Sequence, residues 1–279
     1  MSYLLFDIGG TNTRVTVSED LKTFQKPIRF RTPISYKEGV EKIVAAADEL
    51  GATSIRQAAG AVRGLLSEDR GSIAHDDVLV KWIEEPLADT LAKKLNTKVT
   101  LENDAALAGL GEAHFGAGQG SHIMVYHTIS TGVGGAKIED GKIDSYHLGF
   151  EPGKQVLDID RTILGDEILP TLENLVSGTA VEERLGEPPK NIPQGDALWD
   201  QLAFYLAHGL RNTILYWSPD LIVLGGAMIT GDPVIPIENI RKHVASVLGD
   251  DMPPPRIERG TLKDDAGLYG AMTLLANAE

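Results

Sequence analysis

The chain has 279 residues, of which 42% are hydrophobic and 24% are charged, and its formal net charge at pH 7 is -14. These proportions are typical of a soluble globular protein, and they exclude a disordered chain and a fibrous repeat. The acidic balance argues against nucleic acid as a partner, because binding to nucleic acid needs clustered positive charge. The absence of cysteine excludes disulfides, cysteine–zinc sites and a thiol nucleophile.

The chain shows no pattern typical of a targeting or membrane segment. The amino terminus has no basic region, and Asp7 interrupts its apolar run too early for a signal peptide. No apolar stretch approaches the roughly 18 residues that a transmembrane helix needs. We therefore expect a cytoplasmic protein with no membrane partner.

Strands and helices alternate along the first half of the predicted structure. Residues 3–8 are an apolar run followed by Gly9 and Gly10, which predicts a buried strand that enters a tight turn. A helix over 37–50 has apolar residues at helical spacing and stops at Gly51. The other predicted elements are a returning strand over 14–20, a strand over 55–62, a helix over 86–95, a strand over 97–103 and a helix from residue 104.

The second half of the chain begins in the same way as the first. After the glycine-rich stretch 116–120, which is the predicted domain boundary, an apolar strand over 123–129 runs into a second glycine-rich turn. Because both halves open with a strand, such a turn and a returning strand, we expect two similar domains that bind a ligand between them. The other predicted elements are a hairpin over 136–143, a helix over 197–216, a buried strand over 220–226 and a helix over 265–277.

The turn after the first strand is a candidate phosphate site. It joins Asp7 to Gly9, Gly10 and Thr11. Glycine lets backbone N–H groups approach phosphate oxygens, and threonine adds a hydroxyl donor. Phosphate repels the Asp7 carboxylate unless a divalent cation lies between them, so Asp7 is a candidate magnesium partner. An ordinary glycine hairpin explains the same residues and stays an alternative.

Two further turns have the same character. Ser130 and Thr131 introduce the second turn, while Gly225 and Gly226 end a third strand, where a planar base can lie against bare backbone. Each alone is also compatible with an ordinary turn, but three in one chain favour phosphate binding. None matches the P-loop or the GxGxxG pattern, which argues against P-loop NTPases and Rossmann dehydrogenases.

Asn103 and Asp104 lie where a predicted strand meets a predicted helix. An aspartate at such a point is by default an N-cap. If it faces a cleft, the same carboxylate can instead accept a proton from a substrate hydroxyl, as kinase aspartates do. The residues alone leave both alternatives open.

Together these motifs resemble the actin–hexokinase–heat-shock ATPase superfamily and, within it, the ROK family of sugar kinases and glucokinases. The segments that carry the resemblance are DIGGTNTR (7–14), LENDAALAGLGEAHFGAG (101–118), HTISTGVGGAKIEDGKI (127–143), LIVLGGAM (221–228) and AGLYGAMTLL (266–275). They are similar to the first phosphate loop, the E-N-D-A helix, the second phosphate loop, the adenosine motif and the closing helix. The resemblance implies an α/β fold of two ribonuclease H-like domains around a central cleft. The smaller domain would span 1–115, joined by the helix 265–279, and the larger would span 116–264.

The resemblance also implies an activity and a set of ligands. The activity is that of an ATP-dependent sugar kinase that uses Mg²⁺, with Asp104 as the catalytic base and Asp7 orienting the metal through water. The implied ATP and phosphate ligands are Asp7, Gly9, Gly10, Thr11, Asn12, Thr131, Gly132, Gly134, Gly225 and Gly226. The implied sugar ligands are Gly64, Asn103, Asp104, Glu151, Lys154 and Glu173. The implied assembly is a homodimer.

Three departures from the family pattern change these expectations. The family's cysteine-rich zinc loop is absent, so we expect no zinc. Lys154 stands where the family has histidine, and we expect it to be charged and paired between Glu151 and Glu173. A Lys154 side chain that simply points to solvent is the alternative. The segment HDDVLVKW (75–82) lacks the asparagine that glucokinases place before this tryptophan. No helix-turn-helix precedes the first strand, which argues against the family's repressor branch.

The expected reaction is therefore transfer of the ATP γ-phosphate to a hexose hydroxyl, with the 6-hydroxyl of glucose as the favoured acceptor. An N-acetylhexosamine kinase or a fructose kinase is the alternative on the same scaffold. A catalytically silent sugar-binding regulator is the alternative from another class. The intact phosphate loops and Asp104 argue against the regulator.

Overall fold

The structure is a computed structural model that describes residues 1–250 and 252–278. The chain forms two compact units: Met1–Phe115, Ser145–Gly149 and Asp265–Glu279 make up the first, and Gly116–Asp144 and Phe150–Asp264 make up the second. The short segment Ser145–Gly149, which the sequence places in the larger domain, thus groups with the first unit. Within the described residues, no helix combines the length and apolar character needed to cross a membrane.

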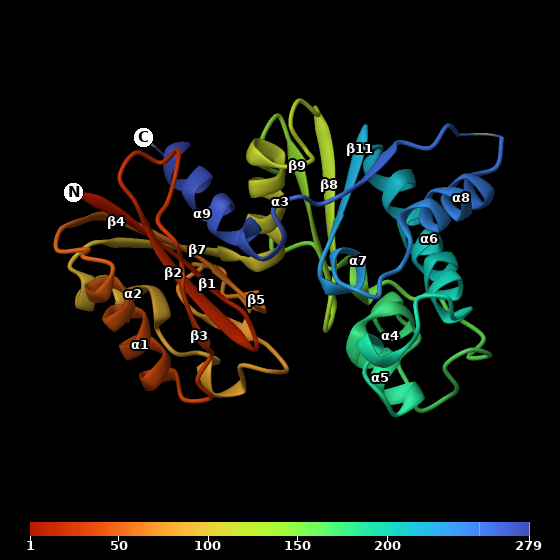
Figure 1. Ribbon diagram of the computed structural model, residues 1–279, viewed down its shortest axis with the longest axis horizontal. Helices are drawn as coiled ribbons and strands as arrows, with labels where there is room; N and C mark the ends of the chain where they lie inside the picture. The colour runs from red at the N-terminus through yellow and green to blue at the C-terminus, as the bar shows by residue number, and fades with distance from the viewer. Residues whose placement is uncertain (251, 279) are drawn as a thin grey trace. The chain divides into compact units, whose positions relative to one another are not determined.

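The first unit is built on a five-stranded sheet of order β3-β2-β1-β4-β7 (Figure 1). The antiparallel part contains β1, β2 and β3, and the parallel part contains β1, β4 and β7. The sheet strands are β1 (Ser2–Ile8), β2 (Asn12–Ser18), β3 (Ile28–Arg31), β4 (Ile55–Val62) and β7 (Lys98–Asn103). The helices are α1 (Tyr36–Glu49), α2 (Leu87–Leu95), α3 (Asp104–Phe115) and α9 (Ala266–Ala276). A small ribbon joins β5 (Leu65–Leu66) to β6 (Ile73–His75), and a short 3-10 turn covers Val80–Trp82. A further 3-10 turn, Lys263–Asp265, lies where the chain passes from the second unit to the first.

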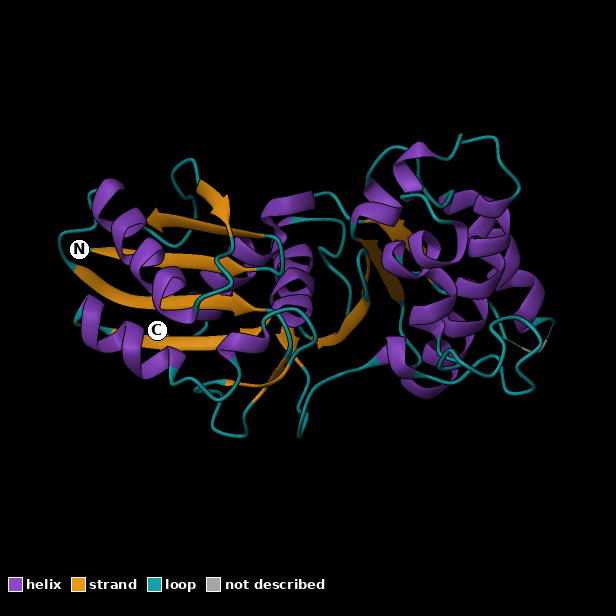
Figure 2. Cartoon of the chain, turned by 90° about the horizontal axis from the view of Figure 1, so that it is seen from below, coloured by secondary structure: helices purple, strands orange, loops and turns teal. Residues whose placement is uncertain are grey.

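The second unit repeats this arrangement with a sheet of order β10-β9-β8-β11-β12. The strands are β8 (Ile123–Ile129), β9 (Val133–Glu139), β10 (Lys142–Ile143), β11 (Leu221–Gly225) and β12 (Arg256–Arg259). The helices are α4 (Leu172–Val176), α5 (Gly178–Leu185), α6 (Leu198–Trp217), α7 (Ala227–Thr230) and α8 (Ile237–Leu248), with 3-10 turns at Pro152–Lys154 and Pro189–Asn191. Figure 2 shows helices against the strands in both units. Because strand order and strand directions repeat, the predicted α/β class with two ribonuclease H-like halves is confirmed.

Side-chain alternation along β1 separates the core of the first unit from its site. Leu4, Phe6 and Ile8 point to the same face, where they are fully buried in one cluster with residues of α1 and α2. Asp7 points to the opposite face, because a Cβ on Gly267 in α9 would lie 3.2 Å from its carboxyl carbon. The alternation therefore buries three large apolar side chains and delivers one carboxylate beside α9.

Helices α3 and α9 pack backbone to backbone on that second face. A Cβ on Gly270 would lie 1.8 Å from the Leu107 carbonyl oxygen, and one on Gly111 would lie 2.4 Å from the Ala266 carbonyl oxygen. Such distances leave no room for a side chain, so each glycine is required where one helix crosses the other. This contact explains why both helices are rich in small residues.

We predict that Gly270→Ala destabilises the protein by about 3 kcal/mol, because the added methyl forces two packed helix backbones apart. Without that clash, alanine would stabilise a helix interior by roughly 1 kcal/mol, so the sign of the effect is informative. Thermal unfolding measures the change. Gly195→Ala is the matched control, since its Cβ meets nothing within 4 Å. Equal melting temperatures of both variants and the wild type would contradict the close packing.

Candidate active site

Asp104 is the first residue of α3, and Asn103 directly before it caps the helix. The Asn103 side-chain oxygen accepts from the Ala106 N–H at 3.1 Å, while its Nδ2 donates to the Gly64 carbonyl oxygen at 3.1 Å. The Asp104 carboxylate accepts from the N–H of the next residue, Ala105, at 2.8 Å, and from its own backbone N–H. The capping role considered for Asp104 thus belongs to Asn103. The Asp104 carboxylate is not needed to hold the helix together.

Two charged side chains act on Asp104 in opposite directions. Burial raises the pKa of the Asp104 carboxyl to about 6, the positive charge of Arg63 opposes this rise, and the negative charge of Asp76 adds to it. A carboxyl group with such a pKa is ionised at neutral pH and still basic enough to accept a proton. This combination suits a general base.

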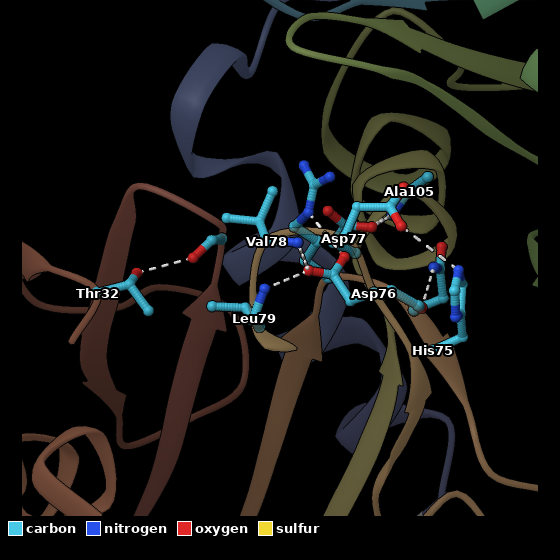
Figure 3. A network of polar contacts seen from close by, with 12 residues as sticks. Thr32, His75, Asp76, Asp77, Val78, Leu79 and Ala105 are labelled. Atoms are coloured by element: carbon cyan, nitrogen blue, oxygen red, sulfur yellow. Dashed lines mark hydrogen bonds and ion pairs between the residues drawn. The ribbon is translucent and has the colours of Figure 1, made fainter. Parts of the chain in front are cut away.

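Arg63 and Asp76 form an ion pair next to this carboxyl. The Arg63 Nε donates to Asp76 Oδ2 at 2.8 Å. The other Asp76 oxygen accepts from the N–H groups of Val78 and Leu79, at 2.8 and 2.5 Å, as Figure 3 shows. Asp76 is therefore fixed by three donors, and it in turn fixes Arg63.

Gly64 adopts a backbone conformation that the Arg63–Asp76 pair needs. Its φ is +97°, and a Cβ there would lie 2.8 Å from the His75 carbonyl oxygen and 2.9 Å from the Asp76 Cβ. With its carbonyl bonded to Asn103, Gly64 joins the β4 end to the β7 end. We expect any sugar contact here to come from its backbone.

The first glycine-rich turn is a tight hairpin between β1 and β2. The Gly9 N–H donates to the Asn12 carbonyl oxygen at 3.1 Å. Thr32 holds the turn from outside, because its hydroxyl donates to the Gly9 carbonyl oxygen at 2.7 Å (Figure 3). The Thr32 N–H also donates to the Thr11 carbonyl oxygen, at 3.0 Å. Arg63 runs past Gly10, whose Cβ would lie 3.3 Å from the Arg63 Cδ. The turn is thus a β-hairpin with several internal and outside contacts, and its role toward phosphate stays a prediction.

Asp7 is the candidate magnesium partner at the end of β1. It is buried, and its Oδ2 lies 3.1 Å from Arg14 Nη1. Mg²⁺ prefers oxygen ligands, and in nucleotide sites one or two carboxylates suffice because phosphates and waters complete the octahedron. The Asp7 carboxylate fits that role chemically.

In the second unit, Glu173 ties the second glycine-rich turn to Lys154. Its Oε2 accepts from the Val133 N–H at 2.8 Å, and a Cβ on Gly132 would lie 2.7 Å from the same oxygen. Its Oε1 lies 2.8 Å from Lys154 Nζ. The expected pairing of Lys154 with Glu173 is observed, although more than half of the Lys154 side chain is exposed. Glu151 is exposed and lies three residues before Lys154 in the chain. Its carbonyl oxygen accepts from the Lys154 N–H.

The remaining predicted turn residues lie at the ends of neighbouring strands of the second sheet. Thr131 and Gly134 lie at the turn from β8 to β9, and Gly225 and Gly226 lie at the end of β11. Gly225 and Gly226 have a packing reason for lacking side chains. A Cβ on Gly225 would lie 2.2 Å from the Tyr126 hydroxyl, and one on Gly226 would lie 2.3 Å from the Ile129 carbonyl oxygen. Their role toward a nucleotide base stays a prediction.

Several charged residues of the first unit were missed by the sequence interpretation. Arg63 directly precedes Gly64, which was the only residue of its segment named as a site residue. Asp76 lies in the segment 75–82, which was considered only for the asparagine that it lacks. Glu102 was missed as well, although a charged residue in an apolar strand directly before Asn103 was a usable signal. Its carboxylate is almost fully buried and bonds to the Asn103 N–H, the Arg70 guanidinium and the Tyr146 hydroxyl. Tyr146 belongs to the segment Ser145–Gly149, so this cluster fastens that segment to the first unit.

Comparisons with known proteins identify the family of the chain. A model of the ROK family matches residues 3–278, which confirms the resemblance seen in the sequence. The chain is 27% identical to the glucokinase of Thermotoga maritima, over 96% of this chain and 95% of that protein. Among solved structures it is similar to the ROK hexokinase from Thermus thermophilus, with a TM-score of 0.83, 25% identity and 100% of both chains covered. It is also similar to a ROK family glucokinase from Streptomyces griseus in complex with glucose and AMPPNP, with a TM-score of 0.82, 24% identity and coverage of 98% of this chain and 99% of that one.

We predict that Asn103→Ala lowers stability by about 1 kcal/mol, because α3 loses its cap. Asn103→Asp keeps a capping oxygen and loses only the donor to Gly64, so its melting temperature should lie closer to that of the wild type. Thermal unfolding of the two variants measures the difference. The capping role would be wrong if both substitutions lowered the melting temperature equally.

Proposed function

The chain belongs to the ROK family, and on that premise we propose that it is an ATP-dependent sugar kinase. The proposed reaction transfers the γ-phosphate of ATP to a hexose hydroxyl, with the 6-hydroxyl of glucose as the proposed acceptor. The similarity to proteins named glucokinase and hexokinase supports this acceptor class. We further propose that the enzyme acts in the cytoplasm as a homodimer.

The single observation that carries the proposal is the state of Asp104. Its carboxylate lies at the end of β7, beside Arg63, and it has no capping task because Asn103 caps α3. A base needs a pKa below the working pH and a carboxylate oxygen that is available to a proton. Asp104, with a pKa of about 6, meets the first condition, and its position at the helix start supports the second.

On the donor side, the proposal assigns the phosphates to the two glycine-rich turns. Gly9, Gly10, Thr11 and Asn12 would hold phosphate oxygens from the first unit, and the donors of the second would be Thr131, Gly132 and Gly134. Asp7 would hold Mg²⁺ through water, and the ion when bound neutralises charge on the phosphates. Gly225 and Gly226 would lie against the adenine base.

On the acceptor side, the proposal assigns sugar hydroxyls to Asn103 and Asp104 in the first unit and to Glu151, Lys154 and Glu173 in the second. Asn103 uses one acceptor and one donor position within the protein, which leaves one of each for a ligand. Lys154 offers only donors, so it suits a hydroxyl oxygen that accepts.

We predict that Asp104→Asn lowers kcat by about 10²- to 10⁴-fold, because the amide cannot take the hydroxyl proton. Sugar binding should stay measurable by calorimetry. A panel of glucose, mannose, fructose and N-acetylhexosamines with coupled ADP detection tests the activity itself and identifies the acceptor. Asp77→Asn is the control, since it removes a carboxylate that is 76% exposed.

The outcomes separate the alternatives. Near-normal turnover of Asp104→Asn would remove this residue as the base. ADP release with fructose or an N-acetylhexosamine, in preference to glucose, would change the acceptor and keep the reaction. Sugar binding with no ADP release from any sugar would favour the silent regulator.

We predict that Lys154→Ala raises the KM for the sugar at least several-fold and leaves the KM for ATP nearly unchanged. The fold should be little affected, because an exposed ion pair contributes no more than about 1 kcal/mol. Lys154→His should restore part of the sugar affinity, since imidazole can both donate and accept. Steady-state kinetics against each substrate measures the effect. A rise confined to the KM for ATP would move Lys154 from the sugar to the nucleotide.

A further inference from the structure

We propose that Arg63 is a further catalytic residue, which contacts the phosphoryl group during its transfer, and that Asp76 is its positioning residue. The inference rests on the proposed kinase function. It adds that a positively charged side chain of this protein contacts the phosphoryl group.

Backbone bonding places Arg63 at the edge of the sheet where the candidate phosphate turn begins. Its N–H donates to the Ile8 carbonyl oxygen at 3.0 Å, so Arg63 follows β4 directly beside the end of β1. Its side chain then runs along Gly10, where a Cβ would lie 3.3 Å from the Arg63 Cδ and 3.6 Å from its Nε. Glycine at this position therefore lets the arginine lie against the turn.

Asp76 holds Arg63 in this position and is itself immobile. The pair is joined at 2.8 Å, and the Asp76 side chain is only 3% exposed, whereas that of Arg63 is 26% exposed. Figure 3 shows Asp76 with Val78 and Leu79, whose N–H groups donate to one of its oxygens. The more exposed member of the pair is thus the cation.

The same guanidinium acts on Asp104, the proposed base. Arg63 opposes the rise in the Asp104 pKa that burial causes, which means that the two side chains interact electrostatically. Arg63 therefore lies near both the turn proposed to hold phosphate and the carboxylate proposed to take the proton. This is the region where negative charge builds up when the phosphoryl group passes to the acceptor.

The transfer step gives the arginine a defined task. The acceptor hydroxyl gives its proton to the Asp104 carboxylate, and its oxygen forms a bond to the γ-phosphorus. The bond from that phosphorus to the bridging oxygen breaks, and the electron pair stays on the β-phosphate of ADP. During this transfer, negative charge spreads over the equatorial phosphoryl oxygens. The planar Arg63 guanidinium, which has several N–H donors, would stabilise that charge.

Three variants test the proposal by steady-state kinetics. Arg63→Gln should lower kcat by about 10²-fold or more, as loss of a donor to transition-state charge does, with the KM for the sugar changed little. Arg63→Lys keeps the charge and loses the forked donors, so about a tenfold loss of kcat is expected. Asp76→Asn should have a smaller effect, because it loosens the cation without removing it. Arg241→Gln, which removes an arginine that pairs with Glu258 on another element, controls for the loss of an ion pair.

The pH profile provides a readout that a purely structural role would not produce. The acid limb of kcat/KM reports ionisation of the base in the free enzyme. Arg63→Gln removes a positive charge and should move that limb to higher pH, whereas Asp76→Asn removes a negative charge and should move it to lower pH. Shifts in the same direction, or none, would contradict the arrangement.

Binding of ADP, Mg²⁺, sugar and aluminium fluoride, which together mimic the phosphoryl group in flight, gives a second readout. The mixture should raise the melting temperature of the wild type and not that of Arg63→Gln, while sugar alone should protect both. If Arg63→Gln does not fold, Arg63→Lys carries the same comparison.

A kcat of Arg63→Gln within threefold of the wild type would overturn the inference while the kinase function stands. If the KM for the sugar rises at the same time, Arg63 would be a sugar ligand instead. A wild type that releases no ADP with any sugar would instead overturn the proposed function, and this inference with it.

Discussion

The contact between the backbones of α3 and α9 positions most of the candidate site in the first unit. Gly111 and Gly270 allow the two helices to cross at a distance that no other residue permits. Asp104 starts α3, and α9 presents Gly267 to the carboxyl group of Asp7. The proposed base therefore starts one helix of this pair, and the other helix packs against the proposed metal partner. Most helix pairs pack through large side chains such as leucine, whereas these two helices pack through glycines that bring the backbones into direct contact.

Polar side chains of the site each serve two neighbours. Asn103 caps α3 with its oxygen and holds the Gly64 carbonyl with its nitrogen. Asp76 caps one turn and holds Arg63, while Glu173 holds the Val133 N–H and contacts Lys154. A side chain with two such bonds has few rotamers left, and its partners are ordered at the same time. Rigidity of this kind keeps functional groups in place before any substrate arrives.

The sequence predicted the central strands and their turns, because long apolar runs that end in glycine are strong local signals. Edge strand β12 was missed, since Ile257 is its only buried residue, and β3 was missed because it has just four residues. Helix α8 carried a readable apolar spacing at Ile240, Val244 and Leu248 that the interpretation did not use. Among site residues, those next to glycine turns could be predicted. The pairs Arg63–Asp76 and Arg70–Glu102 could not, because their partners lie 13 and 32 residues apart and meet only after folding.

The place of α9 in the chain has a consequence for biosynthesis. The first unit draws its sheet from residues before position 104, yet α9 follows the whole second unit in the sequence. During translation, α3 therefore emerges long before the helix that covers it, and its small-residue face stays without its partner while the second unit is made. The second unit can complete its own core first. The first acquires its final form, and with it the surroundings of Asp7 and Asp104, only when α9 arrives.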